Sequence, residues 1–224
     1  MSTCGSTATE NSAKPRRAGR PLDAAKRRAI VETAAQHFFY NGYAATSIEQ
    51  VAADAGVSKV TIYNQFGDKR ALFTAAVECE CEKMRGHFSL EAMPAGSIRD
   101  RLTAIGEAMS AFLFRPEMIQ FERRIAAETE TEPALGEAFL EAGPRRMKQA
   151  FAAWLGHAVA AGELAIADPQ LAAEQFVSMC KGMGDLERRF GATVPPEARR
   201  LRISGAVEVF LAAYAPSAPR AEHR

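Results

Sequence analysis

Polar side chains that can bind phosphate groups and base edges recur at helical spacing after residue 58. Ser58 is a residue type that caps helices, and on the helix after it the pattern places Val60, Ile62 and Phe66 on the inner side. The outer side is then polar, because it consists of Lys59, Thr61, Tyr63 and Asn64. Ammonium, hydroxyl and amide groups are the types that contact phosphates and base edges. The segment therefore favours nucleic-acid recognition.

Two longer helices are expected to hold this segment. The first runs from Asp23, a plausible N-cap, to Asn41, with apolar residues every four positions from Ile30. The other begins at Asp68 and runs to about His87. Its expected inner side consists of Leu72, Phe73, Ala76 and Val77.

A short helix and a tight turn come directly before the polar segment. Thr46 or Ser47 caps this helix, with Glu49 in capping-box register from Thr46, and Gly56 ends it. Its expected inner residues are Ile48, Val51, Ala52 and Ala55. Val57 then fills the angle to the next helix, which is the arrangement of a helix-turn-helix.

These residues resemble the TetR family of transcriptional repressors. The resemblance rests on T-S-I-x-x-V-A-x-x-A-G-V-S-K-x-T-I-Y-x-x-F-x-x-K-x-x-L at residues 46–72, and it covers about residues 23–75. It implies that the helix at 58–64 enters a major groove of double-stranded DNA and that two protomers read a pseudo-palindrome. It places Lys59, Thr61, Tyr63, Asn64, Lys69, Thr46 and Ser47 at the DNA. The family commonly has Gly where this chain has Val60, which leaves the base preference open.

Residues 1–22 are expected to form a basic arm, because they contain almost nothing to bury. Arg16, Arg17 and Arg20 suit a segment that follows a minor groove. The alternative is a tail that only increases solubility.

The rest of the chain predicts an all-α fold with about nine helices in total. Helical patterns occur at about 98–114, 117–130, 133–162, 168–187 and 196–214, and Gly143-Pro144 is expected to break or kink the third. The stretch after residue 132 resembles the C-terminal domain of AcrR- and AefR-type regulators. We therefore expect a DNA-binding domain at 23–75, a helical effector-binding and dimerisation domain at 76–215 and a disordered tail at 216–224.

The last two helices each have two apolar sides, which predicts two packing partners. One side would serve the domain core and the other a second copy of the chain, as the resemblance also implies. The expected interface residues are Val177, Cys180, Gly184, Gly205, Val209 and Ala212. A monomer with thoroughly buried helices is the alternative.

Flexible Met and flat aromatic side chains between about residues 98 and 183 suit an irregular apolar ligand. The candidate lining residues are Met109, Phe112, Phe121, Phe139, Met147, Phe151, Trp154, Phe176 and Met179. Met and Phe at helical spacing are more often plain core, so fewer than half of them are expected to touch a ligand.

Composition excludes several other classes. The 224 residues carry a formal charge of +1, but residues 1–75 contain ten Lys/Arg and only six Asp/Glu. This N-terminal part is therefore the candidate electrostatic surface. No secretory or membrane segment is evident, so we expect a cytoplasmic protein without a membrane partner. Enzyme motifs are missing and the four histidines lie singly, so we expect no catalysis, cofactor or metal.

The interpretation is a homodimeric repressor that a small, largely apolar effector of unknown identity releases from DNA. One alternative is a redox or metal sensor that uses Cys79 and Cys81 with His87. Residues two apart on a helix point about 200° apart, so these thiols do not easily share a metal. The other alternative is an activator of the same fold, for which the sequence offers no acidic activation patch.

Overall fold

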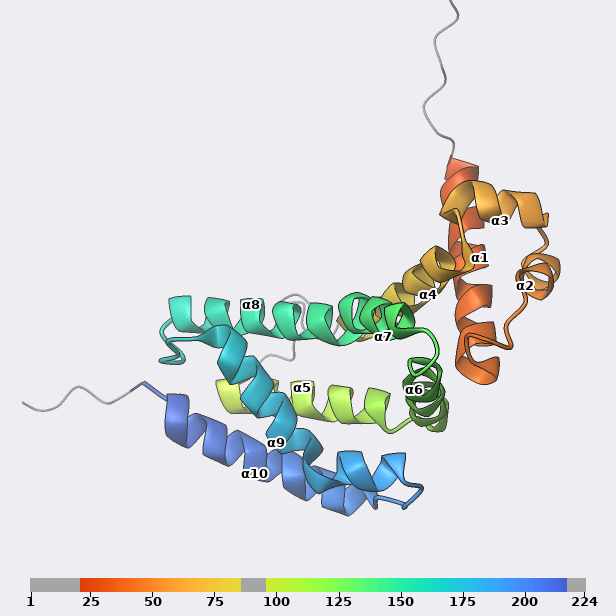
Figure 1. The fold of residues 1–224 in the computed structure, drawn as a ribbon. Coiled ribbons are helices and arrows are strands. Elements are labelled where there is room, and N and C mark those ends of the chain that lie inside the picture. Colours follow the sequence, from red (N-terminus) through yellow and green to blue (C-terminus); the bar gives the residue numbers. More distant parts are fainter. Residues whose placement is uncertain (1–20, 86–95, 217–224) are drawn as a thin grey trace, which may run out of the picture.

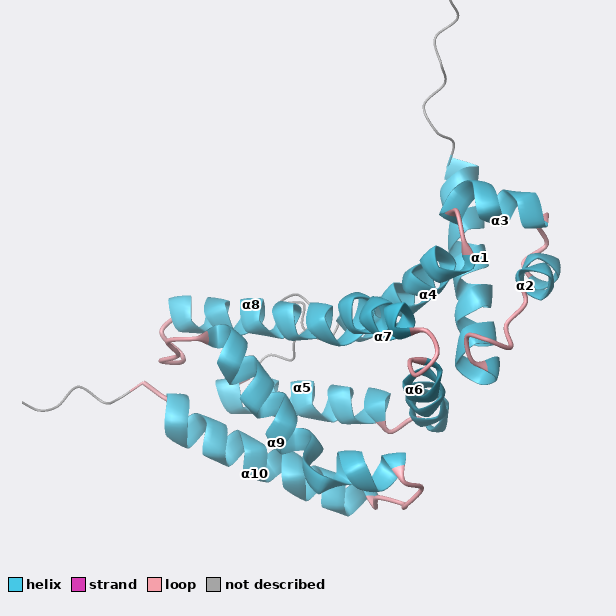
Figure 2. Ribbon diagram, in the orientation of Figure 1, coloured by secondary structure: helices cyan, strands magenta, loops and turns pink. Residues whose placement is uncertain are grey.

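The computed structural model describes residues 21–85 and 96–216, and every regular element in these ranges is a helix (Figures 1 and 2). The α-helices are α1 (Pro21–Asn41), α2 (Ile48–Asp54), α3 (Lys59–Phe66), α4 (Lys69–Arg85), α5 (Ile98–Leu113), α6 (Pro116–Glu128), α7 (Pro133–Leu140), α8 (Arg146–Ala160), α9 (Pro169–Arg189) and α10 (Pro196–Tyr214). A π-helical turn, η2 (Glu141–Arg145), joins α7 to α8. The described residues thus contain nine separate helical runs, and the all-α expectation is confirmed.

Helices α1 to α3 stand at one end of the molecule, and α4 runs from them towards the other helices (Figure 1). The first helix begins at Pro21 rather than at the expected cap Asp23. Proline is favoured in the first turn of a helix, because its missing N–H has no partner there and its fixed φ suits the helix. The predicted inner residues of α4 are all buried.

The core that α1 to α4 form continues into the following helices. Phe39 of α1 stacks on Phe121 of α6 with ring centroids 4.0 Å apart, and Phe121 meets Phe139 of α7 edge-on at 5.7 Å. Phe73 of α4 lies against Phe38 and Phe121 in the same cluster. Apolar packing is therefore continuous across residue 75, and a change in α6 acts directly on the packing of α1.

A second core is formed where α5, α8, α9 and α10 meet. Phe176 of α9 contacts Phe151 of α8 and Phe210 of α10, with ring centroids 5.4 and 5.2 Å apart. Leu102 and Ile105 of α5 are buried in the same cluster. This layer lies away from α2 and α3, with α6 and α7 in between (Figure 1).

Two helices depart from regular geometry. At Gly143-Pro144 the chain forms the π turn instead of breaking, and a Cβ on Gly143 would lie 3.3 Å from the sulfur of Cys81 on α4. Helix α9 is kinked at Gly182, which has φ +48° and ψ −153°. Such a backbone conformation favours glycine, because L side chains rarely adopt it. No helix in the described ranges is long and apolar enough to cross a membrane.

Candidate DNA-binding interface

The turn between α2 and α3 is closed by backbone hydrogen bonds around one glycine. Gly56 has φ +64°, its N–H donates to the carbonyl of Ala53 at 3.1 Å, and the N–H of Val57 donates to Ala52 at 2.9 Å. Val57 packs partly buried against the core, as expected for the residue that fills the angle between the helices. The turn sets the direction of α3 relative to α2, and a left-handed φ at this position suits glycine.

The start of α3 is fixed by the predicted cap. The Ser58 hydroxyl accepts a hydrogen bond from the N–H of Thr61 at 3.1 Å, and the two hydroxyls lie 2.9 Å apart. Thr61 is half-buried, so part of its side chain faces the protein instead of solvent. Tyr63, 41% exposed, and Asn64 face outward as predicted.

Val60 corrects one sequence expectation. Its side chain is 65% exposed, whereas the pattern places it on the inner side of the helix. Ile62 is buried and Phe66 is packed against the core, so those two predictions are confirmed. Eight residues form α3, and in so short a helix two inward positions suffice to attach it to the core.

An ion pair links the first turn of α2 to the first turn of α3. The ammonium of Lys59 donates to the carboxylate of Glu49, and the Ser47 hydroxyl donates to the other oxygen of Glu49 at 2.9 Å. The hydrogen bond from Lys59 lowers the pKa of the Glu49 carboxyl to about 2. Lys59 therefore reaches the surface with part of its charge already neutralised. Ser47 also caps α2 by accepting from the N–H of Gln50 at 3.3 Å.

Thr46 does not have the exposed position that a DNA contact requires. It is 3% exposed, and its hydroxyl donates to the carbonyl of Gly42 at 2.7 Å. The expectation that its side chain contacts DNA is therefore wrong for this conformation. The hydroxyl is used to hold the connection between α1 and α2, and Ser47 rather than Thr46 is the cap.

Lys69 is only half-buried and already has a partner inside the protein. Its ammonium donates to the carbonyl of Ala44 at 3.2 Å and lies 4.6 Å from the centre of the Tyr43 ring. Loss of hydration at this position lowers its pKa. An ammonium has three donors, so this hydrogen bond leaves capacity for a phosphate.

Arg27 of α1 holds the far end of α3, and the sequence analysis did not identify it. Its guanidinium lies 4.2 Å from the centre of the Phe66 ring and donates to the carbonyl of Gln65 at 3.1 Å. The contact joins residues 38 positions apart, so no local spacing signals it.

Helix α6 holds the connection between α1 and α2 with two charged side chains, whereas the sequence suggested for them either a polar ligand group or an ion-paired exterior. Arg124 donates to the carbonyls of Phe39 and Tyr40 at the end of α1, and Glu128 accepts from the N–H of Ala44 at 3.0 Å. A Cβ on Gly42 would lie 2.9 Å from Glu128, so this close approach requires the glycine, whose φ is +87°. We call Arg124 and Glu128 the α6 clamp.

The preceding turn of α6 holds the second half of α9. Glu122 pairs with Arg188 at 2.7 Å, and Arg123 donates to the Arg188 carbonyl. Arg188 is 2% exposed and also pairs with Asp185. Helix α6 therefore connects α9 to the segment between α1 and α2 through polar side chains on consecutive turns, from its middle to its C-terminal end.

The predicted dimer residues divide between two environments. Gly205, Val209 and Ala212 of α10 are exposed, as a surface for a second copy requires. Cys180 and Gly184 are buried inside the protomer, which contradicts their placement on an outer side, and Val177 is half-buried against the second core. Burial raises the pKa of the Cys180 thiol to about 12.

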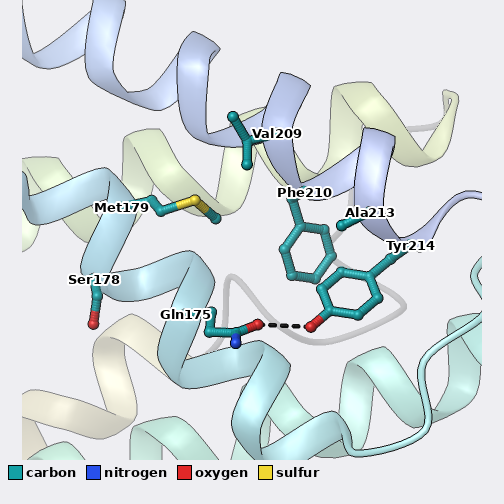
Figure 3. A pocket seen from close by; sticks show the side chains of 7 residues that line it. All are labelled: Gln175, Ser178, Met179, Val209, Phe210, Ala213 and Tyr214. Atoms are coloured by element: carbon teal, nitrogen blue, oxygen red, sulfur yellow. Dashed lines mark hydrogen bonds between the residues drawn. The ribbon is translucent and has the colours of Figure 1, made fainter.

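A hollow of about 410 Å³ lies between α9 and α10 on this exposed side (Figure 3). Its lining residues are Gln175, Ser178, Met179, Val209, Phe210, Ala213 and Tyr214. The hydroxyl of Tyr214 donates to the amide oxygen of Gln175 at 2.6 Å across one end of it. Of the ten large apolar side chains that are exposed in the described residues, six lie on α9, its C-cap or α10.

The nine candidate ligand residues do not share one environment. Phe112, Phe121, Phe139 and Met147 belong to the cluster that α1, α4, α6 and α7 build, whereas Met109, Phe151, Trp154, Phe176 and Met179 belong to the second core. Of these nine, Met179 lines the hollow of Figure 3. A ligand site lined by all nine residues would have to lie between the two clusters.

Some candidates have no structural test. Arg16, Arg17, Arg20 and His87 lie outside the described residues. Cys79 is half-buried and Cys81 is buried on α4. Within the described ranges no three His, Cys, Asp or Glu side chains are grouped to hold a metal ion. The sensor alternative therefore stays an untested prediction.

Two family models match the chain. Residues 30–76 match bacterial regulatory proteins of the tetR family, and residues 100–216 match the C-terminal domain of AefR-like transcriptional repressors. No match is found among curated proteins.

Several solved structures are similar to the chain over most of its length. A TetR-family regulator of Mesorhizobium loti is 28% identical with a TM-score of 0.74, and the alignment covers 88% of this chain and 100% of that one. The flavonoid-responsive regulator FrrA is 30% identical with a TM-score of 0.67, covering 87% and 100%. A TetR-family regulator of Rhodococcus sp. is 25% identical with a TM-score of 0.67, covering 84% and 98%.

Proposed function

The chain belongs to the TetR family of bacterial transcriptional regulators, and we propose that it is a repressor that binds a pseudo-palindromic DNA operator as a homodimer. The observation that carries the proposal is the outer face of α3. Lys59, Tyr63 and Asn64 are exposed there on a helix that Ser58, Gly56 and Arg27 fix in direction. These side chains are of the types that contact phosphates and base edges in a major groove.

Repression is the simplest consequence of such binding. A dimer on promoter DNA excludes RNA polymerase without any further module. The test uses a reporter whose promoter contains a sequence that the protein selects from random duplex DNA. Reporter output should fall when the protein is expressed and recover with a Lys59→Ala, Tyr63→Ala double variant. A rise in output on expression would favour the activator alternative.

The homodimer is proposed from the exposed apolar side of α9 and α10. Val209 is 58% exposed and Met183 is 63% exposed, while Gly205 and Ala212 leave room for close approach of another helix. A second copy that packs here would form a four-helix interface and would cover the hollow of Figure 3. Sedimentation at micromolar concentration tests this, with a dimer as the expected result.

The effector is proposed to be a small, largely apolar molecule that enters between the two clusters. The name of FrrA describes that protein as flavonoid-responsive, which makes flat aromatic compounds the first class to screen. Binding would reach the DNA-binding end through α6, because α6 packs in the first core and holds both Arg188 and the end of α1. An effector lowers DNA affinity only by its differential binding to two conformations, with an expected coupling of about 1–3 kcal/mol.

A further inference from the structure

Val60 is an apolar side chain on the outer face of α3, among residues that are otherwise polar. It is 65% exposed and lies one helical turn before Tyr63. The other apolar side chains nearby, Val57, Ile62 and Phe66, are packed against the core. Val60 is therefore the aliphatic residue that α3 presents to solvent.

The stability of the fold does not explain this choice. A β-branched residue is a weaker helix former than alanine, and a side chain this exposed gains little from burial. Single exposed apolar residues are common on protein surfaces, so the inference depends on the position of this one. Val60 is the second residue of the helix, and the N-terminal residues of a reading helix are those that approach base edges.

The polar neighbours of Val60 restrict what it can meet in the groove. Lys59 is tied to Glu49, and Asn64 lies one turn further along the helix. Lys59, Tyr63 and Asn64 are exposed and can form hydrogen bonds with bases and phosphates, whereas the aliphatic side chain of Val60 can form none. The 5-methyl group of thymine is the apolar group that base pairs present in the major groove.

We propose that Val60 is a specificity-determining residue that packs against the methyl group of a thymine in each operator half-site. This inference rests on the proposed function, because it requires α3 to lie in a major groove. It adds a prediction about the DNA itself, since one thymine is required at a fixed place in each half-site for its methyl group rather than for its base pairing.

The test replaces each thymine of a selected operator by uracil, which removes the methyl group and keeps the pairing. At one symmetry-related pair of positions, wild-type affinity per half-site should fall about fourfold, which corresponds to about 0.8 kcal/mol for one buried methyl-sized group. Val60→Ala should bind the thymine operator less tightly and show no thymine preference at that pair. Leu140→Ala, which shortens an exposed apolar residue on α7, should keep the preference.

Thermal unfolding of Val60→Ala should match the wild type or occur at a slightly higher temperature, because the replaced side chain is exposed and alanine is the better helix former. Equal binding of all thymine and uracil operators by the wild type would overturn the inference while leaving the proposed function intact. A thymine preference that survives Val60→Ala would also overturn it. Failure of the wild type to prefer any sequence would overturn both proposals together.

Discussion

The Glu49–Lys59 pair is the single contact that most directly sets the charge of the α3 surface. Glu49→Gln should release Lys59 to a phosphate, so DNA binding should tighten and the slope of log K against log salt should steepen by about 0.9. Both quantities come from fluorescence anisotropy titrations between about 50 and 200 mM salt. The matched control is Glu197→Gln, because Glu197 forms an exposed pair with Arg200 on α10. Weaker binding by Glu49→Gln would contradict this assignment.

The same pair predicts a pH dependence with a definite sign. Since the pKa of Glu49 is lowered to about 2, its stabilising contribution is complete above its ordinary pKa near 4.5 and is lost as the pH falls towards 2. The difference in unfolding free energy between wild type and Glu49→Gln should therefore be constant from pH 5 to 8 and shrink below about pH 4.5. Urea unfolding at a series of pH values measures it. A difference that changes between pH 6 and 8 would contradict the assignment.

A variant of Lys69 tests whether this ammonium, which already donates to the carbonyl of Ala44, also contacts DNA. Lys69→Ala should weaken binding to all sequences alike and reduce the salt slope by about one. Lys148→Ala on α8, which removes a half-buried lysine paired with Glu174, should leave the slope unchanged. An unchanged slope for Lys69→Ala would mean that Lys69 serves only the Ala44 carbonyl and the Tyr43 ring.

Residue patterns predicted the chemistry of α3 better than the direction of each side chain. Capping by Ser58 and burial of Ile62 follow from local spacing, and both are found. Val60 is exposed where an inward side chain was predicted, because apolar character alone does not fix the direction of a side chain at the first turn of a short helix. Thr46 is buried where a DNA contact was predicted, and it lies before the cap Ser47 of α2. The hydroxyl of Thr46 instead bonds the carbonyl of Gly42, four residues back, which is a local alternative that threonine side chains commonly use.

At the level of elements, α6 is the connection that the sequence did not reveal. The contacts of Arg124 with α1 join residues 84 to 85 positions apart, beyond the reach of any helical period. The faces of α9 were also predicted incorrectly. This helix packs on α5, α8 and α10, so its buried side is wide enough to include Cys180. The kink at Gly182 also interrupts the regular helical rotation, so the residues after it do not continue the face predicted from the residues before it.

The α6 clamp should fix how far apart two reading helices stand. Arg124→Ala removes charged hydrogen bonds to the end of α1, so the free energy of unfolding should fall by about 1–2 kcal/mol. Affinity for one half-site should be unchanged, while tolerance of an added base pair between half-sites should increase. Anisotropy with operators of different spacing measures this, and Arg99→Ala, which breaks an Arg–Glu contact between α5 and α10, is the control. Unchanged spacing preference would show that the clamp only stabilises the fold.

At the scale of the whole molecule, reading a palindrome requires two copies of the chain, which we propose are joined through α9 and α10. Val209→Asp places a charge in the proposed interface, and burying an unpaired charge is strongly unfavourable. The variant should sediment as a monomer, keep its helical circular dichroism and lose affinity for a full palindrome but not for one half-site. A Val209→Asp protein that remains a dimer would place the interface elsewhere.

The most direct test of the central claim is selection by the wild-type protein from random duplex DNA at about physiological salt, where non-specific attraction is weakened. We expect enrichment of a palindrome whose half-site centres are about one helical turn, 34–36 Å, apart. Enrichment of one unpaired site, or of no sequence at all, would contradict a homodimer that reads DNA with α3.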